Sequence, residues 1–127
     1  MAIQGYLEGD AIRFTIELMD STGNIIEVDA LFDTGFTAGV LAIHRDDIEA
    51  LGWPLKNRNT RLPTASGIGR FDLYEGTIVI DGQALPIPVL AGILPEEDRV
   101  LLGSVVLRFM DLTINTATDT YLLTLKV

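Results

Sequence analysis

The feature that most constrains this chain is the apolar stretch Ala30-Leu31-Phe32, which stops at the carboxylate of Asp33 and continues as Thr34-Gly35-Phe36-Thr37. An ionised carboxylate at the end of a buried strand is costly unless hydrogen bonds or a partner stabilise it. Gly35 can adopt backbone angles closed to other residues and lets a second backbone approach. Asp, Thr and Gly are also ordinary turn residues, so the tripeptide alone is weak support for a catalytic site.

Two further segments share this character. Val100-Leu101-Leu102-Gly103 is a second apolar run that ends at glycine, and the segment 104–110 after it is helix-prone. Between the two apolar runs, the segment 62–71 is a glycine-flanked tip that joins two extended stretches. The order of hairpin, apolar run, glycine and helix-prone segment occurs at 12–51 and again at 71–110, which predicts two related halves.

In this order and at this spacing, the segments resemble the retropepsin-like aspartic proteases, the single-lobe relatives of pepsin. The resemblance implies one domain over residues 1–127. Its fold class would be mainly β, a retropepsin-like barrel with one or two short helices, active as a homodimer. Asp-Thr-Gly-Phe-Thr at 33–37 is similar to the pattern of a prokaryotic subgroup. The internal repetition agrees, because lobes of this family are built from a duplicated motif.

Period-two alternation predicts strands along much of the chain. Residues 11–19 alternate and are followed by a turn at 20–24 and a return strand at 25–32. A loop and short strand at 36–43 and a short helix at 44–51, stopped by Gly52, complete the first half. In the second half we expect strands at 56–62, 71–80, 83–90, 100–102, 112–115 and 120–125. Asp81-Gly82 predicts a hairpin turn, and the prolines at 86 and 88 indicate an edge or irregular strand.

Composition narrows the function. The 127 residues are 48% hydrophobic with a net charge of −9, which fits one globular domain and argues against a nucleic-acid partner. The only loose basic cluster is Lys56, Arg58 and Arg61. Without cysteine, disulfides, thiolate nucleophiles and zinc–thiolate sites are excluded. No signal peptide and no apolar run long enough to span a membrane is visible, so the expected location is the cytoplasm.

The chemistry asks for two acids. Peptide hydrolysis without a metal or a covalent intermediate needs a base to activate water and an acid to protonate the substrate. Two carboxylates that share one proton supply both. The chain has one suitable carboxylate, Asp33, and none at Gly103. The expected function is therefore an aspartic endopeptidase, a homodimer with one Asp33 from each chain, acting on a peptide or protein and needing no cofactor or metal.

The resemblance also assigns roles to neighbouring residues. Thr34 would bond to the partner's loop, and Gly35 would present its carbonyl to the substrate backbone. Gly67, Ile68 and Gly69 would belong to a flap that closes over an extended peptide. Phe36, Thr37 and Ile68 would contact the substrate, as would Val40 or Leu41, favouring apolar side chains near the cleaved bond. Phe36 stands where many members of the family carry a small residue, often with a hydroxyl that supports the carboxylate. Ser104 stands where retroviral members carry an Arg that strengthens the dimer.

Structural explanations stand beside the functional ones. His44, the only histidine, is expected to cap or decorate the short helix, and Trp53 to lie in the core. Asp46-Asp47 and Glu96-Glu97-Asp98 are expected on solvated faces or loops, since they lack the spacing of a calcium loop. Asp33 itself could be a structural turn residue in a fold that has lost its catalytic activity. The alternative function is an inactive, retropepsin-like dimeric module that binds a peptide or a partner protein.

Overall fold

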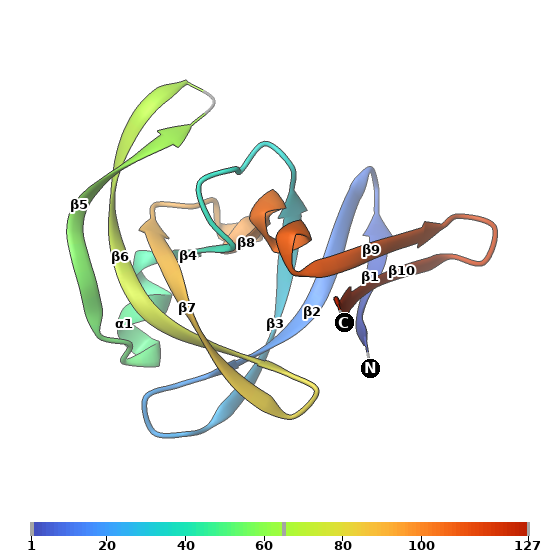
Figure 1. The fold of residues 1–127 in the computed structure, drawn as a ribbon, viewed down its shortest axis with the longest axis horizontal. Helices are drawn as coiled ribbons and strands as arrows, with labels where there is room; N and C mark the ends of the chain where they lie inside the picture. Colours follow the sequence, from blue (N-terminus) through green and yellow to red (C-terminus); the bar gives the residue numbers. More distant parts are fainter. Residues whose placement is uncertain (1, 65, 127) are drawn as a thin grey trace.

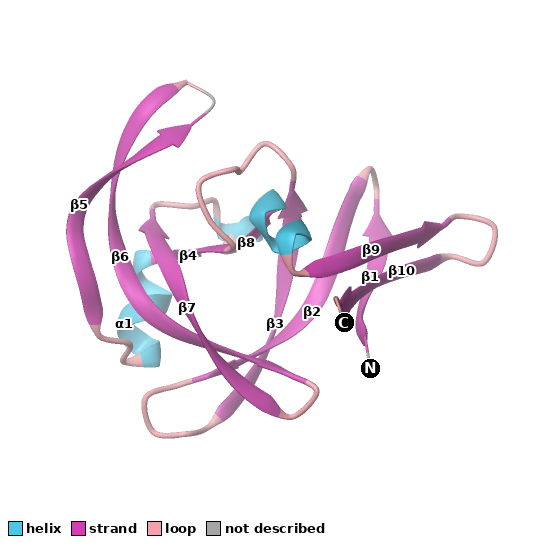
Figure 2. Ribbon diagram, viewed as in Figure 1, coloured by secondary structure: helices cyan, strands magenta, loops and turns pink. Residues whose placement is uncertain are grey.

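The structure, a computed structural model, describes residues 2–64 and 66–126. These residues form ten strands, one α-helix and two short 3₁₀ helices (Figures 1 and 2). The strands are β1 (Ala2–Glu8), β2 (Ala11–Met19), β3 (Ile25–Asp33), β4 (Leu41–His44), β5 (Leu55–Thr64), β6 (Gly67–Ile80), β7 (Gln83–Gly92), β8 (Val100–Gly103), β9 (Met110–Asn115) and β10 (Thr120–Leu125). The helices are α1 (Arg45–Leu51), η1 (Glu96–Asp98) and η2 (Ser104–Arg108).

The strands form one sheet that partly closes on itself. Its order is β5-β6-β7-β4-β8-β3-β2-β1-β10-β9. Because β6 also pairs with β2, the strands between them make a closed barrel, as predicted. Two arms leave this barrel: the β5–β6 hairpin on one side and the β9–β10 hairpin on the other (Figure 1). The mainly β fold class with a short helix is therefore confirmed.

The core fills the barrel and follows the alternation of the sequence. On β2, Phe14, Ile16 and Leu18 are almost fully buried, whereas Glu17 is exposed. The ring of Phe14 meets that of Phe32 edge to face, with centroids 6.0 Å apart. Burying each side chain of this size stabilises the fold by about 1.5–3 kcal/mol. The β2–β3 hairpin is therefore anchored along its inward face, and β3 delivers its last residue to the barrel's edge.

Local signals set the ends of several elements. His44 caps α1, as expected, by accepting a hydrogen bond on Nδ1 from the backbone N–H of Asp46 at 3.2 Å. Gly52 ends the helix in the left-handed conformation that favours glycine. Asp81 and Gly82 both have positive φ angles, as a type I′ hairpin turn requires. Trp53 is buried and donates from Nε1 to the carbonyl of Met19 at 2.8 Å, which confirms its place in the core.

The two predicted halves interlock. In chain order, β2, β3, β4 and α1 of the first half correspond to β6, β7, β8 and η2 of the second. Strand β3 pairs in parallel with β8, and β7 pairs in parallel with β4, so each half contributes a strand to the other. Strands β4 and β8 then pair antiparallel between them. This exchange places the ends of β3 and β7 at related positions of the barrel.

Three expectations differ from the structure. The segment 104–110 begins with a 3₁₀ helix, Ser104–Arg108, because its two β-branched valines favour a helix less than straight-chain residues do. Strand β7 lies inside the sheet. Strand β4 pairs only with the last four residues of β7. Pro86 and Pro88 therefore lie in the part of β7 that has β6 as its single neighbour, where the missing proline N–H groups cost no hydrogen bond to β4. The terminal strand β1 was not predicted; it pairs with the adjacent β2 through a tight turn at residues 9 and 10, and with the distant β10.

Candidate active site

Asp33 is the last residue of β3 and lies beside Gly103 of β8. Its side chain is half-buried, and Oδ1 accepts a hydrogen bond from the backbone N–H of Gly35 at 2.9 Å. The backbone turns sharply here, since the N–H of Phe36 donates to the carbonyl of Asp33 at 3.1 Å. No cation lies within ion-pair distance of this carboxylate in the described part of the chain. Asp33 is thus oriented by its own loop and has no described cationic partner.

The loop that follows Asp33 is fastened to β8. The backbone N–H of Gly103 donates to the carbonyl of Val40 at 2.8 Å, and that of Ser104 donates to the carbonyl of Phe36 at 3.0 Å. A Cβ at Gly103 would collide with the carbonyl oxygen of Gly39 and would lie 2.7 Å from the ring of Phe36. Glycine is therefore required here for close approach. This contact explains why the second apolar run ends at a glycine.

The neighbouring Thr34 and Gly35 are both exposed. The hydroxyl of Thr34 makes no hydrogen bond to any residue in the described part, so it is free to meet a group outside this chain. A Cβ at Gly35 would lie 3.2 Å from Oδ1 of Asp33, so a larger residue would crowd the carboxylate.

A small apolar pocket lies next to this loop, with a volume of about 150 Å³. It brings Gly35, Phe36 and Thr37 together with Thr64 and Phe71 of the β5–β6 hairpin. The other lining residues come from the same loop, from β4, β7 and β8, and from the loop after β7: Ala38, Ala42, Leu90, Ala91, Gly92, Leu94 and Leu101. The pocket is therefore mainly apolar, and its lining begins at Gly35, two residues after Asp33.

The predicted flap is the hairpin of β5 and β6, which rises beside the loop that follows Asp33 (Figure 1). Its end is closed by pairing of Thr64 with Gly67 and by a 2.7 Å hydrogen bond from Thr64 Oγ1 to the Gly67 carbonyl. Ala65, part of the segment 62–71 predicted as the tip, lies outside the described residues. The expected substrate contacts Gly67, Ile68 and Gly69 are not among the residues that line the pocket.

The strand register explains this placement of the flap residues. Ile68 pairs with Pro63 on the outer face of the hairpin, and its side chain is 61% exposed. Gly69 lies on the inner face, where a Cβ would meet the Phe71 ring at 2.7 Å and Thr64 at 3.2 Å. The inner face is thus built of Thr64, Gly69 and Phe71. Of the two predicted pocket alternatives on the following segment, neither Val40 nor Leu41 lines the pocket.

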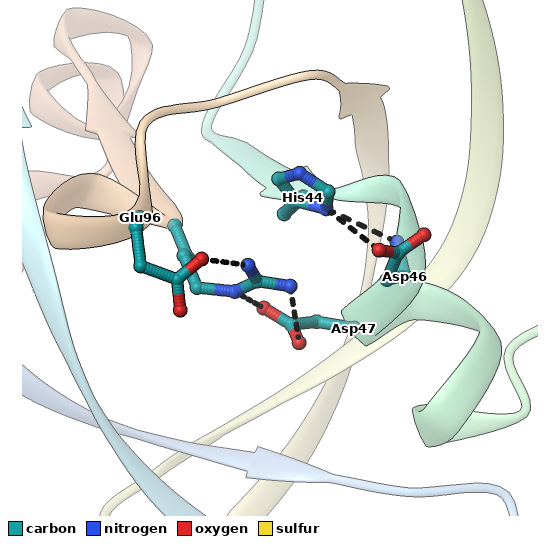
Figure 3. A network of polar contacts seen from close by, with 5 residues as sticks. His44, Asp46, Asp47 and Glu96 are labelled. Carbon is teal, nitrogen blue, oxygen red and sulfur yellow. Dashed lines mark hydrogen bonds and ion pairs between the residues drawn. The ribbon is translucent and has the colours of Figure 1, made fainter.

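A larger pocket of about 480 Å³ lies elsewhere and involves none of the loop after Asp33. It combines an apolar floor with an ion-pair network around Arg99 (Figure 3). Arg99 binds both carboxylate oxygens of Asp47, at 2.8 and 3.1 Å, and Glu96 at 2.8 Å. The bond to Asp47 is the main cause of the raised pKa of Arg99. These acids hold the loop before β8 against α1 rather than forming a reactive pair.

The acidic segments expected on solvated faces are thus partly engaged. Asp98 accepts a 2.9 Å hydrogen bond from Arg13 of β2, and Asp47 and Glu96 pair with Arg99. The sequence did not reveal the Arg13–Asp98 and Arg99–Asp47 pairs because their members are far apart along the chain. Among the described residues, no three His, Asp or Glu side chains are grouped to hold a metal ion.

Several pocket residues were not singled out from the sequence. Phe71 and Thr64 carry the inner face of the flap, and Leu94 comes from the loop after β7. The available signal was the alternation around the glycine tip, which puts residues 69 and 71 on the face opposite residues 68 and 70. Leu94 had no such signal, because only the parallel pairing of β7 with β4 brings its loop here.

No described helix has the length and apolar character needed to cross a membrane.

Comparison with solved structures places this architecture. The chain superposes on a retropepsin-like aspartic protease from Rickettsia conorii with a TM-score of 0.60 and 24% identity, over 97% of this chain and 89% of that one. It superposes on EIAV protease, complexed with the inhibitor HBY-793, with a TM-score of 0.51 and 19% identity, over 74% and 84% of the two chains. No family model and no curated protein sequence matches the chain. The chain therefore has the retropepsin-like fold.

Proposed function

We propose that this chain is an aspartic endopeptidase that hydrolyses peptide bonds as a homodimer. The observation that carries the proposal is the setting of Asp33. Its carboxylate ends a buried strand, is oriented by the N–H of Gly35, has no described cationic partner and borders an apolar pocket. The retropepsin-like fold supports the same function, because the solved proteins with this fold include aspartic proteases.

The mechanism needs a second chain. Two carboxylates a few ångströms apart cannot both ionise, so together they hold one proton, activate a water and protonate the leaving amine. This chain brings one such carboxylate to the loop, and we propose that the partner's Asp33 supplies the other across a twofold axis. Thr34 would bond to the partner's loop, consistent with its free hydroxyl, and Gly35 would offer its carbonyl to the substrate backbone. No metal or cofactor is required.

The proposed substrate is an extended peptide with an apolar residue near the cleaved bond. Main-chain hydrogen bonds would hold it as an added strand, and the 150 Å³ pocket at Phe36 and Thr37 would select the side chain. Gly67, Ile68 and Gly69 would cover the peptide when the hairpin closes. We assign this function to residues 1–127 as one domain, and to the cytoplasm, in keeping with the absence of cysteine.

The test is cleavage of a mixed peptide library between about pH 4 and 7, the range in which a carboxylate dyad titrates in several aspartic proteases. The wild-type chain is assayed beside Asp33→Asn at concentrations where sedimentation shows a dimer. We expect cleavage by the wild type only, with apolar residues at the cut sites. A dimer that binds peptides without cutting them, in both forms, would overturn the proposal.

Mixing the two proteins tests the shared site. In an equal mixture at constant total concentration, only about one quarter of randomly formed dimers carry two carboxylates. Activity should therefore fall to about one quarter of the wild-type value. A fall to about one half would show that each chain acts alone, and would contradict the two-chain dyad.

A further inference from the structure

Basic side chains are distributed unevenly over the molecule. The segment 55–71, which we call the basic hairpin, contains no acidic residue and four basic ones: Lys56, Arg58, Arg61 and Arg70. None of these four side chains has an ion pair or hydrogen bond to a residue in the described part. Four other basic residues do pair with carboxylates: Arg13, Arg45, Arg99 and Lys126. The hairpin is thus an unneutralised basic region on a protein of net charge −9.

The strand register of the hairpin places two of these four charges on one face. Arg61 of β5 lies directly opposite Arg70 of β6, so both side chains share the outer face with Pro63 and the exposed Ile68. Like charges directly opposite in an antiparallel pair destabilise it. An anion placed between the two guanidinium groups would relieve this repulsion and form charge-assisted hydrogen bonds.

A protective role for these charges explains only part of the pattern. Strand β5 ends the sheet, and charged residues or proline on an end strand discourage aggregation. Acidic side chains would serve that purpose equally well in a chain with this composition. Arg70 lies on β6, which pairs with β5 at this position and with β7 only from Leu73 onward, so edge protection extends to Arg70 but does not explain why all four charges are positive. The single sign of the charge therefore calls for a second explanation.

We propose that the outer face of the basic hairpin is a docking surface for an acidic segment of a partner protein. Arginine side chains bind carboxylates in paired hydrogen bonds, and Ile68, 61% exposed, offers an apolar contact beside them. A short acidic segment would touch the hairpin alone, whereas a nucleic acid would extend over the acidic remainder of the surface. The inner face of the same hairpin lines the pocket beside the Asp33 loop, so the docked segment would lie against the cover of that pocket.

The probe is a fluorescein-labelled peptide of alternating glutamate and glycine, followed by anisotropy with the intact chain. We expect binding that weakens as salt is added, because exposed charges are screened. The double variant Arg61→Gln/Arg70→Gln should bind the peptide about fivefold more weakly or worse. The control Arg108→Gln removes an exposed basic residue without a described partner outside the hairpin, and it should bind as the wild type does.

The outcomes separate the explanations. Equal weakening in both variants would show that net charge alone attracts the peptide, and would overturn the proposal. So would tighter binding of a single-stranded oligonucleotide, or no peptide binding at low salt. If the double variant aggregates while neither protein binds the peptide, the charges are only protective. The Asp33→Asn chain should bind the peptide normally, because docking does not depend on hydrolysis.

Discussion

The loops that follow β3 and β7 occupy related places in the two halves but use their acids differently. Asp33 ends β3 beside Gly103 of β8, and Gly92 ends β7 beside His44 of β4. The carboxylate of Asp33 has only a backbone N–H as its described partner. In the loop after β7, Glu96 pairs with Arg99 and Asp98 pairs with Arg13, so both acids are tied to arginines.

The acids of the two loops differ in whether an arginine side chain holds the carboxylate. Glu96 and Asp98 each hold their loop in place through an ion pair, whereas Asp33 is only oriented by one amide of its own loop. The end of β7, Gly92, carries no acid, so the second half of the chain brings no carboxylate to the corresponding strand end. We therefore propose that the second carboxylate comes from a partner chain.

The largest expected effect is on cleavage. Asp33→Asn keeps an oxygen that can accept from Gly35 but removes the titrating group, so we expect activity to fall by at least about a thousandfold. Asp98→Asn, in the other loop, should lose stability and keep cleavage. Initial rates and urea denaturation of both variants check this. Activity lost in Asp98→Asn and kept in Asp33→Asn would contradict the roles that we assign to the two acids.

The next effect is on packing beside the two loops. Gly103→Ala places a Cβ against the carbonyl of Gly39, so the free energy of unfolding should fall by about 3 kcal/mol. Gly92→Ala is the matched control, because the nearest atom to its Cβ is 3.7 Å away on Leu94. That variant should stay within about 0.5 kcal/mol of the wild type. Similar losses in both variants, measured by urea denaturation, would show that the close contact at β8 is not special.

A smaller effect is expected from the arginine that fastens the second loop. Arg13 donates to Asp98 at 2.9 Å and to Glu8 at 3.2 Å, with 15% of its side chain exposed. We expect Arg13→Gln to lower the free energy of unfolding by about 1–2 kcal/mol. Arg108→Gln, which breaks no described ion pair, is the control for charge. If both variants melt at the same temperature, the loop is not fastened in this way.

The smallest effect concerns pH and a third acid with a structural role. Hydrogen bonds from the Thr22 hydroxyl and then the Asn24 N–H lower the pKa of Asp20 in the β2–β3 turn. A lowered folded pKa stabilises the protein above the unfolded value of about 3.9, and this contribution is lost as the pH falls through the folded pKa. The stability gap between wild type and Asp20→Asn should therefore narrow below about pH 4. A gap that stays constant in urea titrations would contradict this.

Much of the fold followed from local pattern. Alternation on β2 predicted that Phe14, Ile16 and Leu18 point inward. The turn residues at 20–24 and at 81–82 predicted the β2–β3 and β6–β7 hairpins. Each of these signals acts within a few residues. The strand β1 and the exchange of strands between halves did not follow. The exchange depends on pairing between distant segments, for which a single sequence carries no local signal, whereas the turn at Gly9-Asp10 did signal the hairpin of β1 with β2 and was overlooked.

The candidate site was predictable in its centre and less so at its margins. Asp33 was identified from an unusual sequence pattern, an apolar run that ends at an acidic residue. The inner-face residues Thr64 and Phe71 were not singled out, because their position depends on where the hairpin folds over the loop. The ion pairs of Arg13 and Arg99 were also missed, since each joins side chains from different parts of the chain.

The parallel pairing of β3 with β8 also bears on how the protein folds. Asp33 and Gly103 are about seventy residues apart, and closing so long a loop precedes any gain from the contact, so this pairing should form slowly. During synthesis, the loop around Asp33 has no β8 to rest on until nearly the whole chain has emerged. The order of assembly would thus delay a competent site until the rest of the barrel is in place.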